Sequence, residues 1–292
     1  MIDMHMHSSY SDGDKTVREL LAICEEKKLE YISLTDHNNL HQYSDPALKE
    51  NIFHGKIIKG LEMDATFQNK KIEILAYNIK NKDVIHQWNH RFFSKEKIQQ
   101  WQEGIRKKLL AACDKKNLVY DNALITKEIP QNEFISILIY EDLLKHPQNL
   151  PILGELANSL TVFIRKGLLN SNSDYCVLPF DTEQPLYTDV IDTIHKAGGL
   201  AFLAHPFEYR LTDTLSFIDM LREQNELDGI ECFHPSATKE QSQILEDYAN
   251  KHHLYISGGS DYHGHYKPDI FIGIGRGDLA ISKSYVEKWA NK

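Results

Sequence analysis

The chain has 292 residues, of which 41% are hydrophobic and 26% are charged, and its formal net charge is −9. This composition is ordinary for a folded globular protein and excludes a disordered chain. The acidic balance argues against a broad nucleic-acid surface but leaves room for a mononucleotide or a short oligonucleotide. No apolar run approaches the length of a membrane span and the first residues do not resemble a signal peptide, so we expect a cytoplasmic protein.

The four cysteines lie far apart and form no Cys-x-x-Cys pair. This spacing favours reduced, packed thiols over disulfides or a thiolate metal site. Any metal bound by this chain would therefore use nitrogen and oxygen ligands.

The first part of the chain alternates short apolar runs with amphipathic stretches, which is typical of βα units around a parallel sheet. Thr16 and Glu19 have the spacing of a capping box, which predicts a helix over 16–28. The expected strands are 2–7, 31–34, 57–61 and 72–77.

The same alternation returns near residue 186, with expected helices at 188–197 and 239–252. The expected strands are 200–204, 229–233 and 254–257. Between the two parts, residues 86–184 are helical and charged at first and then irregular. We interpret 86–184 as a mainly helical inserted cap or substrate domain, and 1–85 with 185–292 as one α/β domain.

Side chains that can bind metal follow the predicted strands. His5 and His7 are two apart on a strand, so both leave the same face and can bind one cation. Alone, this pair fits ordinary polar surface better than a metal site. The next strands end in Asp36-His37 and in Glu62, at the position where barrel enzymes place catalytic groups.

The later strands follow the same rule. The strand at 200–204 runs into His205, and the strand at 254–257 runs into Asp261 and His263. A capping or loop residue would explain any one of these positions. Their repetition at every such strand end favours a shared metal site.

With these motifs the sequence resembles the PHP (polymerase and histidinol phosphatase) family. The resemblance covers about residues 1–80 and 186–275 and implies a distorted (β/α)₇ barrel of the TIM type. The long insert resembles the branch that contains phosphatases of AMP and of nucleoside 3′,5′-bisphosphates and small-RNA exonucleases. The matching motifs are His5-Met6-His7, Ser11-Asp12-Gly13, Thr35-Asp36-His37, Gly60-Leu61-Glu62, Ala204-His205-Pro206 and Gly259-Ser260-Asp261-Tyr262-His263-Gly264.

The resemblance implies two or three divalent metal ions per chain, and mixed imidazole and carboxylate ligands suit Mn, Fe or Zn. The implied ligands are His5, His7, Glu62 and Asp261 for the first ion, Glu62 and His205 for the second, and Asp12, His37 and His263 for the third.

Two positions depart from the branch. Glu73 stands eleven residues after Glu62, where the branch has a histidine, and we predict that it serves as a ligand of the second metal rather than as an exposed strand residue. A histidine motif of the insert is replaced by Leu156-Ala157-Asn158-Ser159. Both changes bear on the second metal and on substrate choice.

The implied reaction is hydrolysis of a phosphate monoester, in which the metal ions lower the pKa of a bridging water so that it attacks as hydroxide. His205, His263 and Asp261 are the catalytic candidates, with either histidine able to protonate the leaving oxygen. Arg210 and Arg276 are candidates for binding phosphate, with solvated surface positions as the alternative. His234 is a candidate substrate contact, with simple loop packing as its alternative.

We expect the substrate to be a nucleotide or a short oligonucleotide. Histidinol phosphate is the alternative within the family, and a non-catalytic PHP-like metal-binding module is the alternative of another class. Degenerate modules lose strand-end ligands, which this chain largely keeps. The sequence indicates no membrane association and no obligate protein partner.

Overall fold

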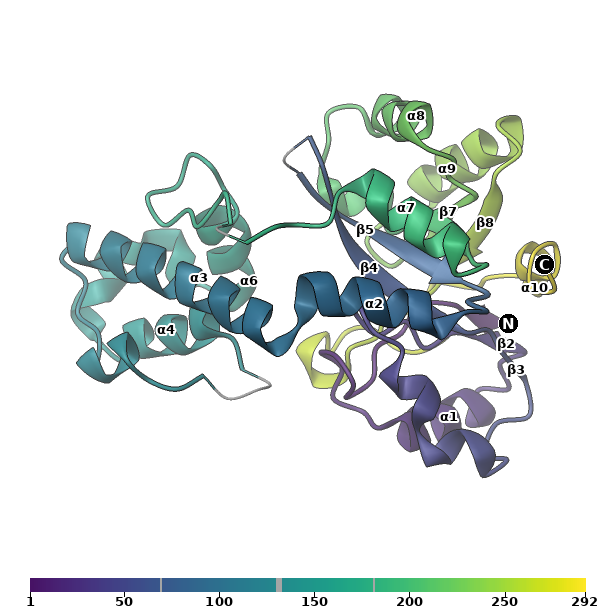
Figure 1. The fold of residues 1–292 in the computed structure, drawn as a ribbon, viewed down its shortest axis with the longest axis horizontal. Coiled ribbons are helices and arrows are strands. Elements are labelled where there is room, and N and C mark those ends of the chain that lie inside the picture. The colour runs from purple at the N-terminus through teal and green to yellow at the C-terminus, as the bar shows by residue number, and fades with distance from the viewer. Residues whose placement is uncertain (69, 130–132, 181) are drawn as a thin grey trace. The chain divides into compact units, whose positions relative to one another are not determined.

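The computed structural model describes residues 1–292 except 69, 130–132 and 181. The chain divides into two compact units, one formed by residues 1–91 and 185–292 and the other by residues 92–184 (Figure 1). The first unit contains all the strands of the described residues, and the second is helical. None of the described helices combines the length and the apolar character needed to cross a membrane.

The strands of the first unit form two sheets. One sheet is parallel, in the order β1-β2-β3, and the other has the order β4-β5-β6-β7-β8. In the larger sheet β6, β7 and β8 are parallel, whereas β5 is antiparallel to both of its neighbours. The strands are β1 (Ile2–Asp3), β2 (Tyr31–Ile32), β3 (Lys56–Ile57), β4 (Gly60–Phe67), β5 (Lys70–Tyr77), β6 (Leu200–Leu203), β7 (Gly229–Phe233) and β8 (Tyr255–Gly258).

The expectation of parallel pairing throughout is wrong at β5. Phe67 at the end of β4 pairs with Lys70 at the start of β5, and so short a connection permits only an antiparallel pair. The strand expected at 57–61 is also wrong, because it is divided between β3 and β4. Glu62 therefore lies near the beginning of a long strand and not at a strand end.

Backbone hydrogen bonds continue beyond the strands and connect the two sheets. The His7 N–H donates to the carbonyl of Tyr262 (2.9 Å), and the Thr35 N–H donates to the carbonyl of Met6 (2.8 Å). The Glu62 N–H in turn donates to the carbonyl of Thr35 (3.1 Å). The segments that follow β8, β1 and β2 therefore lie side by side with the start of β4.

Helices surround these sheets. The capping box predicted at Thr16 and Glu19 is confirmed at the start of α1 (Val17–Glu26). α7 (Tyr187–Lys196) packs on β4 and β6, and α9 (Lys239–Lys251) packs on β7 and β8 (Figure 1). The unit also contains α8 (Thr214–Gln224), α10 (Lys283–Glu287) and α2 (Lys82–Phe93) up to residue 91.

A hydrophobic core joins the two sheets. Tyr77 of β5 packs against Phe202 of β6 and against Trp289, with ring centroids 5.1 and 5.0 Å away, and its hydroxyl donates to the carbonyl of Met4 (2.9 Å). Leu75 is buried in the same cluster. Because side chains alternate along a strand, Glu73 lies on the same face of β5 as these core residues. The core thus fixes the strand that carries Glu73.

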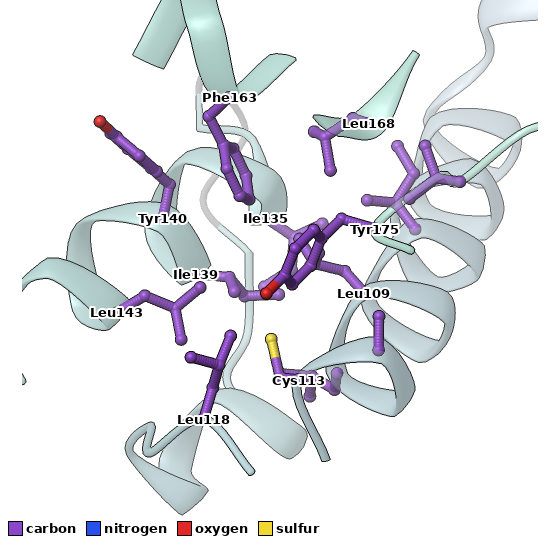
Figure 2. Packing of buried hydrophobic residues seen from close by; sticks show 14 of the residues in the cluster. Leu109, Cys113, Leu118, Ile135, Ile139, Tyr140, Leu143, Phe163, Leu168 and Tyr175 are labelled. Carbon is purple, nitrogen blue, oxygen red and sulfur yellow. The ribbon is translucent and has the colours of Figure 1, made fainter. Parts of the chain in front are cut away.

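The second unit has its own hydrophobic core. Figure 2 shows Leu109 and Cys113 from α3 facing Ile139 and Leu143 from α4, with Phe163 at the top of the view. All of these side chains are buried. The helices are α3 (Lys95–Lys115), α4 (Ile135–Leu144), α5 (Leu150–Leu153), α6 (Leu160–Val162) and a π-helical segment at Phe163–Leu168.

Candidate metal centre

Four buried side chains from distant parts of the chain meet in the first unit, and we call them the central group (His5, His7, Glu62 and Asp261). The Nε2 atoms of His5 and His7 lie 3.2 and 3.3 Å from Glu62 Oε2. The same two atoms lie 3.4 and 3.3 Å from Asp261 Oδ1. Two imidazole nitrogens and two carboxylate oxygens therefore surround one small volume.

The chemistry of the central group fits a divalent cation. The Nε2 atoms of His5 and His7 are buried, and neither makes a hydrogen bond of good geometry within the described part of the chain. Burying polar atoms without partners is costly, and one cation would satisfy both imidazoles and both carboxylates together. Within the protein alone, burial opposes the charged form of His5, but Glu231, Glu62 and Asp261 outweigh this and raise its pKa well above the usual value.

A second cluster, the Glu73 group (Glu62, Glu73 and His205), adjoins the first. His205 Nε2 lies 3.0 Å from Glu62 Oε1 and 3.3 Å from Glu73 Oε2. The two oxygens of Glu62 thus face different groups, which is the geometry of a bridging carboxylate. Burial lowers the pKa of His205, but Glu62, Glu73 and Glu231 raise it to about 9.

A third cluster, the outer group (His7, Asp12, His37 and His263), is more open. Asp12 Oδ2 lies 3.3 Å from His263 Nε2 and 3.6 Å from His37 Nε2, and Asp12 Oδ1 lies 3.3 Å from His7 Nδ1. Burial would raise the pKa of Asp12, but His37, His263 and His7 hold it below its usual range. The three clusters bring together all the residues predicted to be metal ligands.

Two glycines permit the loops that carry Asp12 and Asp261 to pack closely against the segment of His5 and His7. A Cβ on Gly13 would lie 2.2 Å from the carbonyl oxygen of His7, and a Cβ on Gly259 would lie 2.3 Å from the backbone nitrogen of His5. Both distances are far inside van der Waals contact, so only glycine fits. These positions let the loops that carry Asp12 and Asp261 approach the chain that carries the two histidines.

Two carboxylates support the clusters without being among the residues predicted as ligands or catalytic groups. Glu231 Oε1 accepts a hydrogen bond from His5 Nδ1 (2.9 Å), and Glu231 Oε2 accepts one from the His205 N–H (2.8 Å). Asp36 accepts hydrogen bonds from the hydroxyls of Ser8 (2.8 Å) and Ser11 (2.7 Å) and so fixes the loop before Asp12. An acidic residue inside the apolar strand at 229–233 was the available signal for Glu231.

The predicted substrate contacts differ in their positions. His234 lies beside the central group, with its Nε2 3.2 Å from Asp261 Oδ2, an oxygen that Lys267 also contacts. Arg276 is exposed and donates to Asp269 Oδ2 (2.7 Å) and to the carbonyl of Pro235 (2.6 Å).

Arg210 is exposed and has a left-handed backbone conformation at the end of a 3₁₀ turn. Among the residues that the structure describes, neither arginine forms an ion pair or a side-chain hydrogen bond with the three clusters.

The chain is similar to a known protein family and to enzymes with assigned activities. Residues 3–265 match the model of the PHP domain. The 5′-3′ exoribonuclease Rnm of Salmonella typhimurium is 26% identical over 285 residues, which cover 94% of this chain and 88% of that protein. The 3′,5′-nucleoside bisphosphate phosphatase of Chromobacterium violaceum is 24% identical, with coverages of 90% and 87%.

A solved structure has a similar fold. It is that of a Bifidobacterium adolescentis protein assigned as a metal-dependent phosphoesterase, and it aligns with a TM-score of 0.66 at 22% identity. The alignment covers 98% of this chain and 94% of that one. The similarity therefore extends over both units of the chain and not only over the strands that carry the clusters.

Proposed function

This chain belongs to the PHP family and is a phosphoesterase, and we propose that it hydrolyses the phosphate monoester of a nucleotide or a short oligonucleotide. The observation that carries this proposal is the central group, in which buried imidazole nitrogens that make no hydrogen bond with the described residues face two carboxylates. One relative named above is an exoribonuclease and the other a nucleoside bisphosphate phosphatase, which supports this class of substrate.

The central group would hold one divalent ion, the Glu73 group a second and the outer group a third. Such ions supply an activated water and neutralise charge on the phosphoryl oxygens. Glu62 would position two of them, because its two oxygens face different groups. The donor atoms suit Mn, Fe or Zn.

The protein's own side chains position the reactants. His205 and His263 are the proposed proton donors to the leaving oxygen. His234 is the proposed substrate contact, because its imidazole lies beside Asp261 and its Nδ1 is hydrogen-bonded to the Ser236 hydroxyl (2.6 Å). Arg210 and Arg276 remain weaker candidates, because the structure links neither to the clusters.

We infer that the two sheets close into the distorted (β/α)₇ barrel expected of the family. The backbone hydrogen bonds that join the two sheets support this closure, and they link His7 to Tyr262, Thr35 to Met6, and Glu62 to Thr35. Residues 86–184, expected to be inserted in this barrel, would form the cap that selects the substrate. A cytoplasmic location is part of the same proposal.

The test removes metal and varies the substrate. Phosphate release is measured for AMP, adenosine 3′,5′-bisphosphate, a 5′-phosphorylated triribonucleotide and histidinol phosphate, after chelation and again after addition of Mn²⁺. We expect chelation to abolish turnover, Mn²⁺ to restore it and the nucleotides to react fastest. Full activity in protein shown to contain no metal contradicts the mechanism, and a preference for histidinol phosphate contradicts the substrate class.

A further inference from the structure

Lys71 places a positive charge beside the Glu73 group. Its Nζ lies 3.1 Å from Asp64 Oδ1 and 3.2 Å from Glu73 Oε1. Asp64 on β4 is the cross-strand partner of Glu73 on β5, so the ammonium lies between carboxylates of adjacent strands. Asp64, Glu73 and His37 also have the spacing of a cation site, and the Lys71 ammonium contacts two of these three residues.

The carboxylate of Glu73 is shared between Lys71 and the predicted metal ligands. Its Oε1 faces Lys71, and its Oε2 lies 3.3 Å from His205 Nε2. A cation paired with one oxygen of a carboxylate draws negative charge from the other oxygen and repels a second cation nearby. The central group contains a comparable pairing, because Asp261 Oδ1 faces the imidazoles of His5 and His7 while Lys267 contacts Asp261 Oδ2.

We propose that Lys71 is a built-in cation that pairs with Asp64 and Glu73 and weakens the binding of a metal ion by the Glu73 group. This inference rests on the metal centre proposed above and goes beyond it, because it assigns a role to a residue that contacts no substrate. Lys71 acts through Glu73 and is a positioning residue.

The matched control is on the same strand. Lys70 precedes Lys71, is exposed, and by strand alternation points to the opposite face. Lys70→Met therefore removes the same charge from the neighbouring position without removing the ion pairs to Asp64 and Glu73. Lys71→Arg keeps the charge at the site, whereas Lys71→Met and Lys71→Gln remove it.

The experiment measures Mn²⁺ binding to each full-length variant by isothermal titration, and metal content after dialysis by mass spectrometry. We expect Lys71→Met and Lys71→Gln to bind one Mn²⁺ about tenfold more tightly than the unaltered protein does. Lys70→Met and Lys71→Arg should bind it as the unaltered protein does. Unchanged or weaker binding in both neutral variants, with a preserved circular dichroism spectrum, overturns the inference.

A failure of the Lys71 inference can be distinguished from a failure of the proposed function. A protein that binds Mn²⁺ but hydrolyses none of the phosphate esters contradicts the proposed function, and the titration still decides the role of Lys71. An active protein whose Mn²⁺ affinity is insensitive to Lys71 contradicts only the inference. Half of the Lys71 side chain is exposed to solvent (51%), so its replacement leaves the core intact.

Discussion

Glu231 and His5 form a buried pair in which His5 Nδ1 lies 2.9 Å from Glu231 Oε1. A carboxylate can only accept, so Nδ1 carries a proton, and Nε2 is the nitrogen that remains to bind a cation in the central group. The other oxygen of Glu231 accepts from the backbone of His205. One carboxylate thus orients histidines that belong to two different clusters.

Glu231→Gln should weaken metal binding without unfolding the protein. The amide keeps the size of the side chain but loses the charge that holds the His5 proton, and such supporting partners typically account for roughly 10–100-fold in metal affinity. Activity measured against Mn²⁺ concentration should show a higher requirement for metal and partial recovery at saturation. An unchanged requirement would mean that Glu231 has only a packing role.

Asp261→Ala and His7→Ala should each remove nearly all turnover while the fold survives. Both residues belong to the central group, and the hydrophobic core that joins the sheets lies elsewhere. Circular dichroism and thermal unfolding check the fold, and phosphate release checks the reaction. The exposed Asp247→Ala on α9 is a matched control and should keep full activity. Loss of folding without a specific loss of turnover would point to a purely structural metal.

Glu73→His should change the metal preference. An imidazole is a softer ligand than a carboxylate and carries no negative charge, so the ratio of Zn²⁺ to Mn²⁺ affinity should rise. To measure this ratio, Zn²⁺ and Mn²⁺ are added together to protein freed of metal, and the bound metals are then determined. Glu73 Oε2 lies 3.3 Å from His205 Nε2, which is the placement a ligand needs. An unchanged ratio would remove Glu73 from the ligand set.

Asp3→Ala should destabilise the first unit. The carboxylate of Asp3 is buried and accepts hydrogen bonds from the backbone N–H groups of His5 (3.3 Å), Ser260 (2.9 Å) and Gly273 (2.7 Å). Its removal leaves three backbone donors without this partner, at a cost of about 3 kcal/mol or more. Urea unfolding at neutral pH measures the loss. A change below about 0.5 kcal/mol, typical of a surface position, would show that water replaces the carboxylate.

The strand-end pattern predicts most of the residues that gather at the clusters. It worked because parallel strands place their carboxyl ends at one edge, and His5, His205 and Asp261 all follow such strands. Glu62 and Glu73 reach the same clusters because they lie on β4 and β5, two adjacent antiparallel strands. Glu62 was predicted as a strand-end residue, although it lies near the start of β4. Of the two, only Glu73 was included because of the family resemblance.

The remaining features depend on register, which local sequence does not specify. Lys71 meets Asp64 only because β4 and β5 pair antiparallel with Asp64 opposite Glu73. A shift of one residue would move Lys71 to the other face. The direction of β5 was also missed, because Gln68-Asn69 is not one of the strong hairpin signals such as Asn-Gly.

The contact between Asp3 and Ser260 joins positions 257 residues apart. Contacts between such distant segments form late in folding, because a long loop must be ordered before they can form. During synthesis the chain emerges from its amino terminus, so His5 and His7 are exposed long before Asp261 exists to complete their cluster. The order of synthesis therefore makes metal loading a late event that follows assembly of the whole chain.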